Sequence, residues 1–237
     1  NDLWRYDPDP KKWSWEGGSD IYDEEGVYYA SSADPALFPG AREQSISWYD
    51  NATLWLFGGY GFGDNSIQSP VAGRLNDLWT FDNETKQWAW VSGSPNMSVP
   101  DGLIIPGIYG TKGGPSAPEN VPGARQTSVS WLGLYGNLWL FGGLGFDNIN
   151  AFGYLNDLWR FELPECVFDS HCPDYDLYCD GPDTCDNGTW VKGPAPCSPA
   201  TDEYCNEDID ECQECGPDVP CVDTECSVGA TCVDGVC

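Results

Sequence analysis

Cysteine is the residue type best placed to do chemistry in this chain, and all twelve cysteines follow residue 165. They are Cys166, Cys172, Cys179, Cys185, Cys197, Cys205, Cys212, Cys215, Cys221, Cys226, Cys232 and Cys237. Such a density is typical of small secreted domains that disulfides hold together. Zinc is the rival, but the pair Cys212 and Cys215 has no second pair or histidine at zinc spacing. We predict disulfides throughout, with a pairing that the sequence leaves open.

Carboxylates offer a second chemistry in the same segment. The stretch "DIDEC" at 208–212 resembles the start of a calcium-binding EGF-like module, but the Cys-x-Cys of such modules is missing after it. Calcium binds carboxylate and carbonyl oxygens, so Asp208, Asp210 and Glu211 are candidate ligands. The alternative is a solvated acidic surface, and we assign no metal to it.

Catalytic residue sets are hard to assemble from this sequence. His171 is the single histidine, and no Gly-x-Ser-x-Gly motif occurs. Acid pairs for glycoside hydrolysis stay open, because carboxylates abound and sequence does not give their separation. We predict no enzyme activity, no catalytic residue and no cofactor site.

Four Asn-x-Ser/Thr sequons fall on expected turns, at Asn51, Asn83, Asn96 and Asn187. Such sequons accept N-linked glycans on the secretory route. Together with the cysteines they predict an extracellular protein, either secreted or on a cell surface.

The formal net charge is −28, which would repel nucleic acid and anionic lipid. No apolar run approaches the length of a membrane span, so we predict no membrane insertion. The sequence has no initiating Met or signal peptide, and we expect a piece of something longer.

Before Cys166 the chain is a tandem repeat. "NDLW" begins at 1, 76 and 156, "PGAR" at 39 and 122, and "LWLFGG" at 54 and 138. "WSW" at 13–15 returns as "WAW" at 88–90. These markers keep one order, which is the signature of a repeat architecture.

Each repeat predicts four short strands in an antiparallel meander. In the complete repeat these are "QSISWY" (44–49), "LWLFGG" (54–59), "DLWTF" (77–81) and "QWAWV" (87–91), rich in aromatic and β-branched residues. The two indoles of "WAW" should share one face of their strand. The Gly-Gly pairs suit a strand end that needs positive φ or close backbone packing. Helix signals are nearly absent, so the fold class is all-β.

Recurrence by repeat also predicts roles for single residues. Tryptophan at repeat positions indicates a core role rather than a ligand platform; these are Trp4, Trp13, Trp15, Trp79, Trp88 and Trp90. Arg42 and Arg125 end the two "PGAR" copies, and we expect each to form a salt bridge that packs its repeat.

Residues 1–162 resemble the kelch repeat, the blade of a β-propeller. The likeness rests on Gly-Gly after an apolar strand, on "NDLW" and on the W-x-W that follows. The loop at 107–125 also resembles that of secreted kelch proteins related to the central domain of galactose oxidase. The copper site of that enzyme needs two histidines and a cysteine-linked tyrosine in the propeller, and residues 1–165 have neither histidine nor cysteine. Propellers usually close with at least four blades, and this sequence supplies two complete units. We expect either that upstream blades are missing from this sequence or that the incomplete sheets meet another chain.

The third "NDLW" leads into Pro164 and Cys166 rather than into another W-x-W strand. We therefore predict two domains. Residues 1–163 form kelch-type blades, two complete units plus a partial one, and residues 164–237 form a disulfide-stapled segment with little regular structure.

Two functions follow from these patterns. The first is a structural or adhesive glycoprotein whose blades form a rigid scaffold for other protein subunits, with the cysteine-rich segment as a stalk. It would assemble with itself or bind cell-surface or matrix proteins, and a filament subunit is one form of it. The alternative is part of a secreted carbohydrate-active or galactose-oxidase-like enzyme whose catalytic residues lie outside this segment.

Overall fold

The structure is a computed structural model that describes most of the chain before residue 165 and parts of the rest. The described residues are 1–29, 37–50, 53–64, 71–99, 102–133, 136–164, 166–167, 184–186 and 188–191, with strands 203–206 and 211–214 described without their side chains. These residues contain no helix, and every pair of strands is antiparallel. The predicted all-β class is confirmed.

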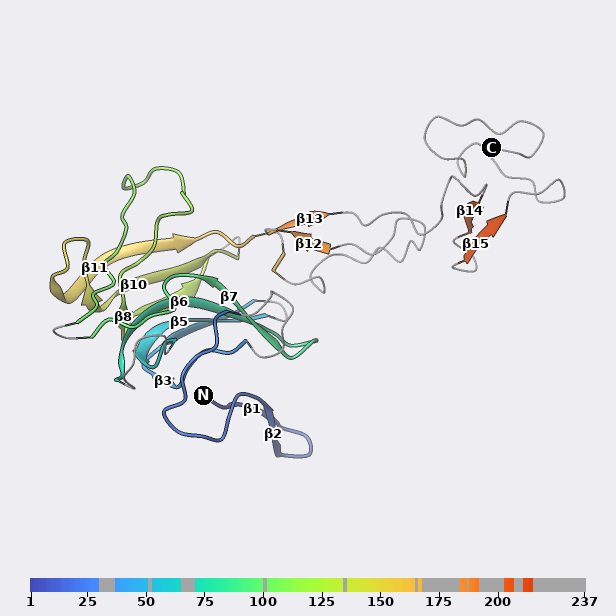
Figure 1. The fold of residues 1–237 in the computed structure, drawn as a ribbon, viewed down its shortest axis with the longest axis horizontal. Coiled ribbons are helices and arrows are strands. Elements are labelled where there is room, and N and C mark those ends of the chain that lie inside the picture. Colours follow the sequence, from blue (N-terminus) through green and yellow to red (C-terminus); the bar gives the residue numbers. More distant parts are fainter. Residues whose placement is uncertain are drawn as a thin grey trace. The chain divides into compact units, whose positions relative to one another are not determined.

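The chain divides into two compact units, Asn1–Leu163 and Pro164–Cys237 (Figure 1). The first contains β1 (Leu3–Asp7), β2 (Lys12–Gly17), β3 (Arg42–Glu43), β4 (Ile46–Asp50), β5 (Thr53–Gly61), β6 (Gly73–Asp82), β7 (Gln87–Ser92), β8 (Arg125–Gln126), β9 (Val129–Leu132), β10 (Leu138–Phe146) and β11 (Phe152–Phe161). The second contains β12 (Thr184–Asp186), β13 (Thr189–Val191), β14 (Glu203–Asn206) and β15 (Glu211–Glu214).

The complete repeat forms a five-stranded sheet in the order β3-β5-β6-β7, with β4 also paired to β5. This is the predicted meander. Opposite residues in β6 and β7 are Trp79 and Trp90, and Phe81 and Trp88. Because side chains alternate along a strand, both indoles of "WAW" lie on the face that carries Trp79 and Phe81, as predicted.

The Gly58-Gly59 pair lies inside β5 and not at its end, so the predicted strand end was wrong, whereas the predicted positive φ is confirmed. The register with β6 shifts between Phe57 and Gly59, where φ is +61° at Gly58 and +101° at Gly59. Glycine adopts positive φ without a Cβ clash, so the strand bulges and then continues its pairing.

The next repeat forms a second sheet in the order β11-β10-β8, with β9 also paired to β10. In the described part of the chain no W-x-W strand follows β11, as the sequence predicted. The outer edge of β11 therefore has no strand beside it among the described strands.

The first "NDLW" and "WSW" form only the β1–β2 hairpin. Trp4 lies opposite Trp15, and Tyr6 lies opposite Trp13. The core role predicted for these tryptophans is wrong, since Trp4, Trp13 and Trp15 are 50%, 65% and 51% exposed, whereas Trp79 is fully buried. The rings of the hairpin pack on one another and not against a second sheet. The centroids of Trp4 and Trp15 are 6.4 Å apart.

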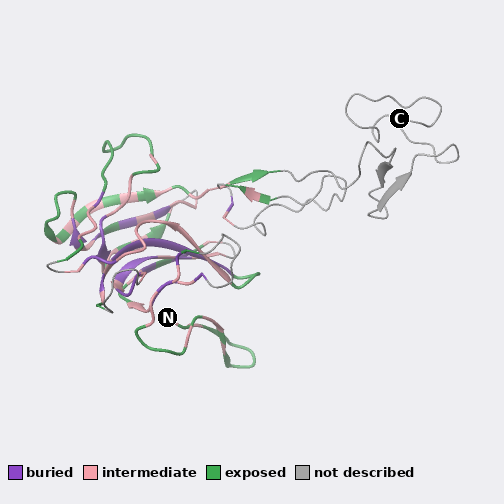
Figure 2. Ribbon diagram, viewed as in Figure 1, coloured by how far each residue is buried: buried purple, intermediate pink, exposed green. Residues whose placement is uncertain are grey.

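The hairpin, the β3–β7 sheet and the β8–β11 sheet follow one another as layers (Figure 1). The Trp48 indole N–H donates to the carbonyl oxygens of Trp131 (3.2 Å) and Trp139 (3.1 Å), which ties the two sheets together. Burial is densest in the middle layer, where β6 is buried along most of its length (Figure 2).

In the second unit one disulfide is described, between Cys166 and Cys185, nineteen residues apart in sequence. Cys185 lies opposite Trp190 in the β12–β13 hairpin. The described residues include no apolar helix of membrane-spanning length.

Candidate functional site

A buried polar cluster in the β3–β7 sheet joins Arg42 to Asp77. The Arg42 guanidinium donates to both Asp77 carboxylate oxygens, at 2.7 Å each. Its remaining donors reach the carbonyl oxygens of Gly40 (3.0 Å) and Gly58 (3.2 Å). Such a two-pronged contact is the geometry in which an arginine binds a carboxylate most strongly.

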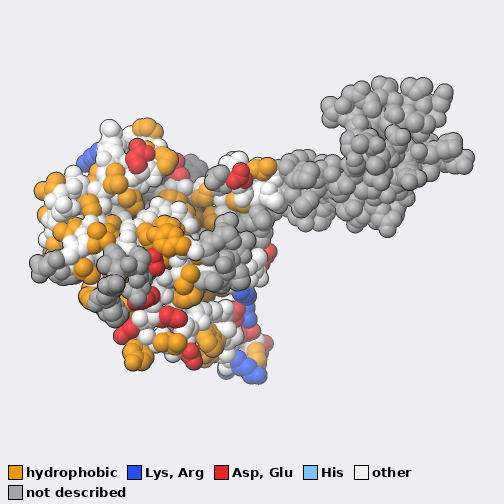
Figure 3. Space-filling model, viewed as in Figure 1, with side chains coloured by type: hydrophobic (Ala, Val, Ile, Leu, Met, Phe, Trp, Pro, Cys, Tyr) orange, Lys and Arg blue, Asp and Glu red, His pale blue; other side chains and the backbone are white. Residues whose placement is uncertain are grey.

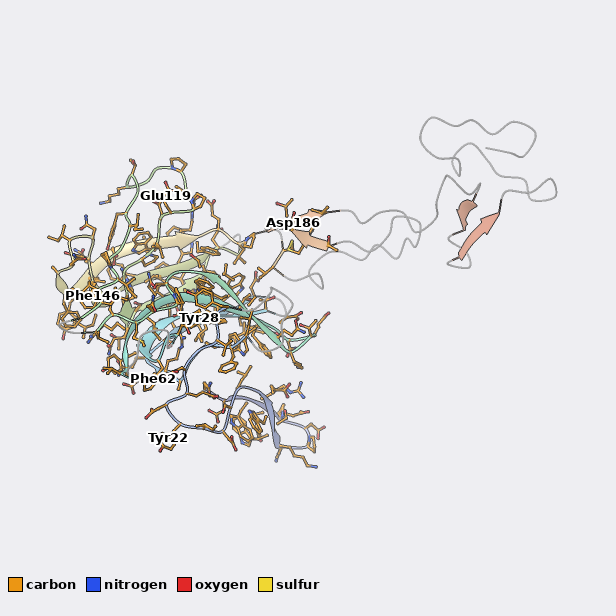
Figure 4. All side chains as sticks on the ribbon, in the orientation of Figure 1. Tyr22, Tyr28, Phe62, Glu119, Phe146 and Asp186 are labelled. Carbon is orange, nitrogen blue, oxygen red and sulfur yellow. A yellow bond between two sulfur atoms is a disulfide. The ribbon has the colours of Figure 1, made fainter. Side chains whose placement is uncertain are left out.

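Two aromatic side chains complete this cluster. The Tyr28 hydroxyl and the Trp79 indole N–H both donate to Asp77 Oδ2, each at 2.6 Å. The two rings pack with centroids 4.8 Å apart. Tyr28 reaches the β3–β7 sheet from the segment before β3 (Figure 4).

The second sheet repeats the cluster with its own residues. Arg125 donates to the two oxygens of Asp157 at 2.7 and 2.8 Å, and to the carbonyls of Gly123 and Gly142. The Tyr109 hydroxyl and the Trp159 indole both donate to Asp157 Oδ2. The salt-bridge role predicted for Arg42 and Arg125 is therefore confirmed.

The pKa values of the two tyrosines, of Arg42 and of Asp157 are shifted further from neutral pH. Burial, together with the neighbouring Asp77 carboxylate, raises the pKa of Tyr28 well above its ordinary value. Burial alone would lower the pKa of Arg42, but the Asp77 charge raises it overall. In the second cluster, burial and Asp157 raise the pKa of Tyr109 to about 12.

Burial would also raise the pKa of Asp157, but hydrogen bonds from Arg125, Tyr109 and Trp159 outweigh it and lower that pKa to about 2. General acid–base catalysis works best with a pKa near the operating pH. These clusters are instead suited to fixing a loop and a strand to each sheet.

Among the described residues of the first unit, cavities occur at two places that bear on function. One of ≈ 60 Å³ lies between the sheets, where Leu138, Leu140 and Phe161 face Trp48 and Phe57. The other, of ≈ 240 Å³, is lined by Glu24, Lys86 and Trp88 among others. Ligand pockets usually measure about 300–1,000 Å³, so both are small for an organic substrate. The described residues contain no group of three His, Cys, Asp or Glu side chains that would hold a metal.

A large apolar surface lies on the outer side of the β8–β11 sheet. We call it the uncovered face; it consists of Val129, Trp131, Phe141 and Leu158, exposed by 61%, 43%, 44% and 55%. Figure 3 shows hydrophobic side chains at the surface of this unit. Contiguous exposed apolar patches on a protein surface can mark interaction sites.

The same repeat positions are buried in the neighbouring sheet. Ile46, Trp48, Phe57 and Leu78 pair in the same register and are between 5% and 8% exposed. They are covered by the β8–β11 sheet, whose Phe161 ring lies 6.0 Å from that of Trp55. The uncovered face is thus the surface that a further layer would cover.

Few of the predicted site residues lie among the described residues. Asn83 is exposed on the β6–β7 turn, and Asn96 is half-buried. The other predicted sites lie outside the described residues: Asn51, Asn187, Asp208, Asp210 and the side chain of Glu211. Among the cysteines, the bond between Cys166 and Cys185 is described.

Sequence reasoning missed the tyrosines and the uncovered face. "IY" precedes "PGAR" in both repeats, ending at Tyr22 and Tyr109, but the tyrosine that meets Asp77 is Tyr28. Trp131 and Trp48 occupy the same repeat position in similar sequences. Their burial differs only because a neighbouring sheet covers Trp48.

Comparisons with known proteins identify no family for this chain. No protein-family model matches the sequence, and no curated protein matches it. Solved structures do match, and one of them is the structure of YjhT, with 18% sequence identity and a TM-score of 0.32. The match covers 57% of this chain and 25% of YjhT, so the chain spans about a quarter of that protein's length. At this level the similarity assigns neither a family nor a function.

Proposed function

We propose that this chain is a non-enzymatic extracellular glycoprotein whose sheets are kelch-type β-propeller blades that bind other protein subunits. The ordered return of "NDLW", "PGAR" and "LWLFGG" on successive antiparallel sheets supports the blade assignment. The second unit then acts as a disulfide-stapled stalk, and the Cys166–Cys185 bond supports that part.

The uncovered face is the observation that carries the proposal. It repeats, position by position, a face that the molecule buries elsewhere against a second sheet. Fully burying one exposed large apolar side chain contributes about 1.5–3 kcal/mol. These four are about half exposed, so covering each contributes roughly half of that amount and favours association.

The partner that we propose for this face is a second copy of the chain. Inside the molecule, Trp159 and Phe161 help to cover the equivalent face. Their counterparts in the first "NDLW" are Trp4 and Tyr6, which are about half exposed on the β1–β2 hairpin. The two ends of the layered unit are therefore complementary, and copies joined head to tail form the start of a filament.

Sedimentation velocity of the secreted protein over a range of concentrations tests this function. We expect the mass to rise with concentration, and we expect Trp131→Lys combined with Phe141→Lys to remain a monomer. Ile149→Lys is the matched control, because Ile149 is 75% exposed on the β10–β11 turn outside the uncovered face. A wild-type protein that stays monomeric throughout, or equal behaviour of both variants, contradicts the proposal.

A further inference from the structure

Among the described residues, Arg74 is the arginine that has no carboxylate partner. The others each form an ion pair with an acid: Arg5, Arg42, Arg125 and Arg160. The chain has 38 acidic and 10 basic residues, so its cations are not short of acids to pair with. The isolation of Arg74 is therefore a property of its position, and its charge is available to an anion from a partner.

The Arg74 guanidinium lies against aromatic rings. Its Cζ atom is 4.2 Å from the centre of the Phe152 ring and 5.6 Å from the centre of the Tyr60 ring. Phe152 is 51% exposed, and its ring packs on that of buried Phe146 with centroids 5.3 Å apart. Such stacking uses the flat face of a guanidinium and none of its N–H donors. The edge of the group therefore stays available for hydrogen bonds.

The donors of Arg74 differ in their access to solvent. Nε is buried without a partner among the described residues, whereas the two terminal nitrogens are not buried. Burial, the main cause, lowers the pKa of Arg74, and Tyr60 offsets only part of this effect. In Arg42 the Asp77 carboxylate outweighs the same effect. A carboxylate at the terminal nitrogens would supply the kind of partner that Arg42 already has.

The backbone holds Arg74 in place from both sides, although the repeat does not require an arginine there. Arg74 lies opposite Tyr60 in β5, and it exchanges backbone hydrogen bonds of 2.9 and 2.7 Å with Ser98. "GRLNDLW" at 73–79 returns as "GYLNDLW" at 153–159, with Tyr154 at the matching position. Arg42 and Arg125, in contrast, recur together with their acids. Arg74 is thus a rigidly placed cation that the repeated contacts do not use, and such placement lowers the cost of binding.

We infer that Arg74, with Phe152 and Tyr60, docks a partner protein through one Asp or Glu carboxylate that has an aromatic side chain beside it. The carboxylate accepts two hydrogen bonds from the terminal nitrogens of Arg74. The aromatic side chain covers the exposed part of the Phe152 ring, and arginine and aromatic residues are the types enriched where interfaces bind most strongly.

Two observations favour a protein with a single carboxylate over other anions. The net charge of −28 repels polyanions, so one negative charge on a mostly neutral surface fits best. Neither of the two cavities described above is lined by Arg74 or Phe152, and small molecules bind mainly in concave pockets. The site is instead an exposed surface, which suits a protein.

This inference goes beyond the proposed function, because none of the three residues belongs to the uncovered face. Arg74→Tyr should therefore sediment as wild type does over the same range of concentrations. Failure of binding at Arg74 would leave self-association intact, and a monomeric wild-type protein would leave binding at Arg74 intact.

The probe is N-acetyl-Glu-Phe-amide, which has one carboxylate beside one aromatic ring. The full chain is labelled with ¹⁵N-arginine, and the Nε–H signal of Arg74 is identified by its absence in Arg74→Tyr. We expect the probe to shift this signal in a saturable way. N-acetyl-Gln-Phe-amide should bind about tenfold or more weakly, because its neutral amide replaces a charged acceptor.

Variants of the chain identify the groups that bind. Phe152→Leu keeps the Arg74 signal but removes the ring, and should weaken binding about two- to fivefold. Arg160→Lys is the control, because Arg160 is already paired with Glu162, and it should bind as wild type. Near-UV circular dichroism checks that Arg74→Tyr folds, as Tyr154 at the matching position leads us to expect.

Three results overturn the inference. The first is the absence of a saturable shift, and the second is equal affinity for the Glu and Gln probes. The third is an equal response to acetate at the same concentration, which would show a site for any small anion in place of a protein partner.

Discussion

Arg42 and Asp77 lie 35 positions apart in sequence and meet through two hydrogen bonds of 2.7 Å. Both side chains are nearly or fully buried. The pair links the "PGAR" entry of one sheet to the "NDLW" strand of the same sheet, and Arg125 and Asp157 do so in the next. Recurrence at matching positions makes this contact the structural signature of the repeat.

Arg42→Lys should lower the free energy of unfolding by about 3 kcal/mol, because lysine cannot serve both carboxylate oxygens and leaves a buried charge poorly paired. Urea titration of the variant measures this loss. The control is Arg5→Lys, since Arg5 is 55% exposed and contacts Glu16 at 3.3 Å. A surface pair of that kind should change stability by less than about 1 kcal/mol. Equal losses in both variants would contradict the role given to Arg42.

Acid should weaken the second cluster within a defined pH window. The folded pKa of Asp157 is about 2, below its ordinary value, so its contribution to stability is present above about pH 4. That contribution is lost as the pH falls through about 2. Thermal midpoints of wild type and Asp157→Asn, measured from pH 5 to 2, should therefore converge as the pH falls. A constant difference across the window would refute the assignment.

High pH should remove the contribution that Tyr109 makes to stability. Its folded pKa is about 12, above the ordinary value, so its contribution is present below about pH 10 and lost as the pH rises through about 12. Tyr109→Phe should unfold with a flatter pH dependence than wild type in this range. Identical alkaline unfolding curves for the two proteins would count against the buried hydroxyl.

Gly58→Ala should destabilise the protein by about 1–3 kcal/mol. A Cβ at this position would lie 2.9 Å from the Arg125 carbonyl oxygen and 3.0 Å from that of Leu75, at a φ of +61°. Gly153→Ala is the matched control, because no atom lies within 4 Å of the place its Cβ would occupy and the residue is in β11. Thermal denaturation compares the two, and an equal effect would show that the bulge tolerates a side chain.

Asn83 should carry an N-linked glycan in secreted material, because it is exposed on a turn and begins a sequon. Intact-mass measurement of Asn83→Gln should show the loss of one glycan relative to wild type. Asn120→Gln, which is outside any sequon, should leave the glycan mass unchanged. An unaltered glycan mass in Asn83→Gln would show that this turn is not modified.

The strand pattern could be read from the sequence because each repeat alternates aromatic and polar residues between turn signals. Residues 44–49 and 87–91 overlap β4 and β7 closely, whereas 77–81 is only the second half of β6. The glycine pairs were misplaced for a physical reason. Positive φ is common both to a strand end and to a bulge, and only pairing with a neighbouring strand separates the two.

Burial of the repeated tryptophans could not be read in the same way. Trp79 and Trp4 occupy one repeat position, yet the first is buried and the second half exposed. The difference depends on whether another layer and another strand adjoin the residue. A local sequence pattern holds no information about such a neighbour, which is also why the uncovered face was not predicted.

Photo-crosslinking from position 131 tests the central claim most directly, since it asks what covers the uncovered face. Trp131 would be replaced by p-benzoylphenylalanine, and isotope-labelled and unlabelled chains would be mixed, irradiated and digested. We predict crosslinks between position 131 of one copy and residues 1–17 of another, which include Trp4 and Tyr6. Products confined to single copies, or joined to the Pro164–Cys237 unit, would contradict the account.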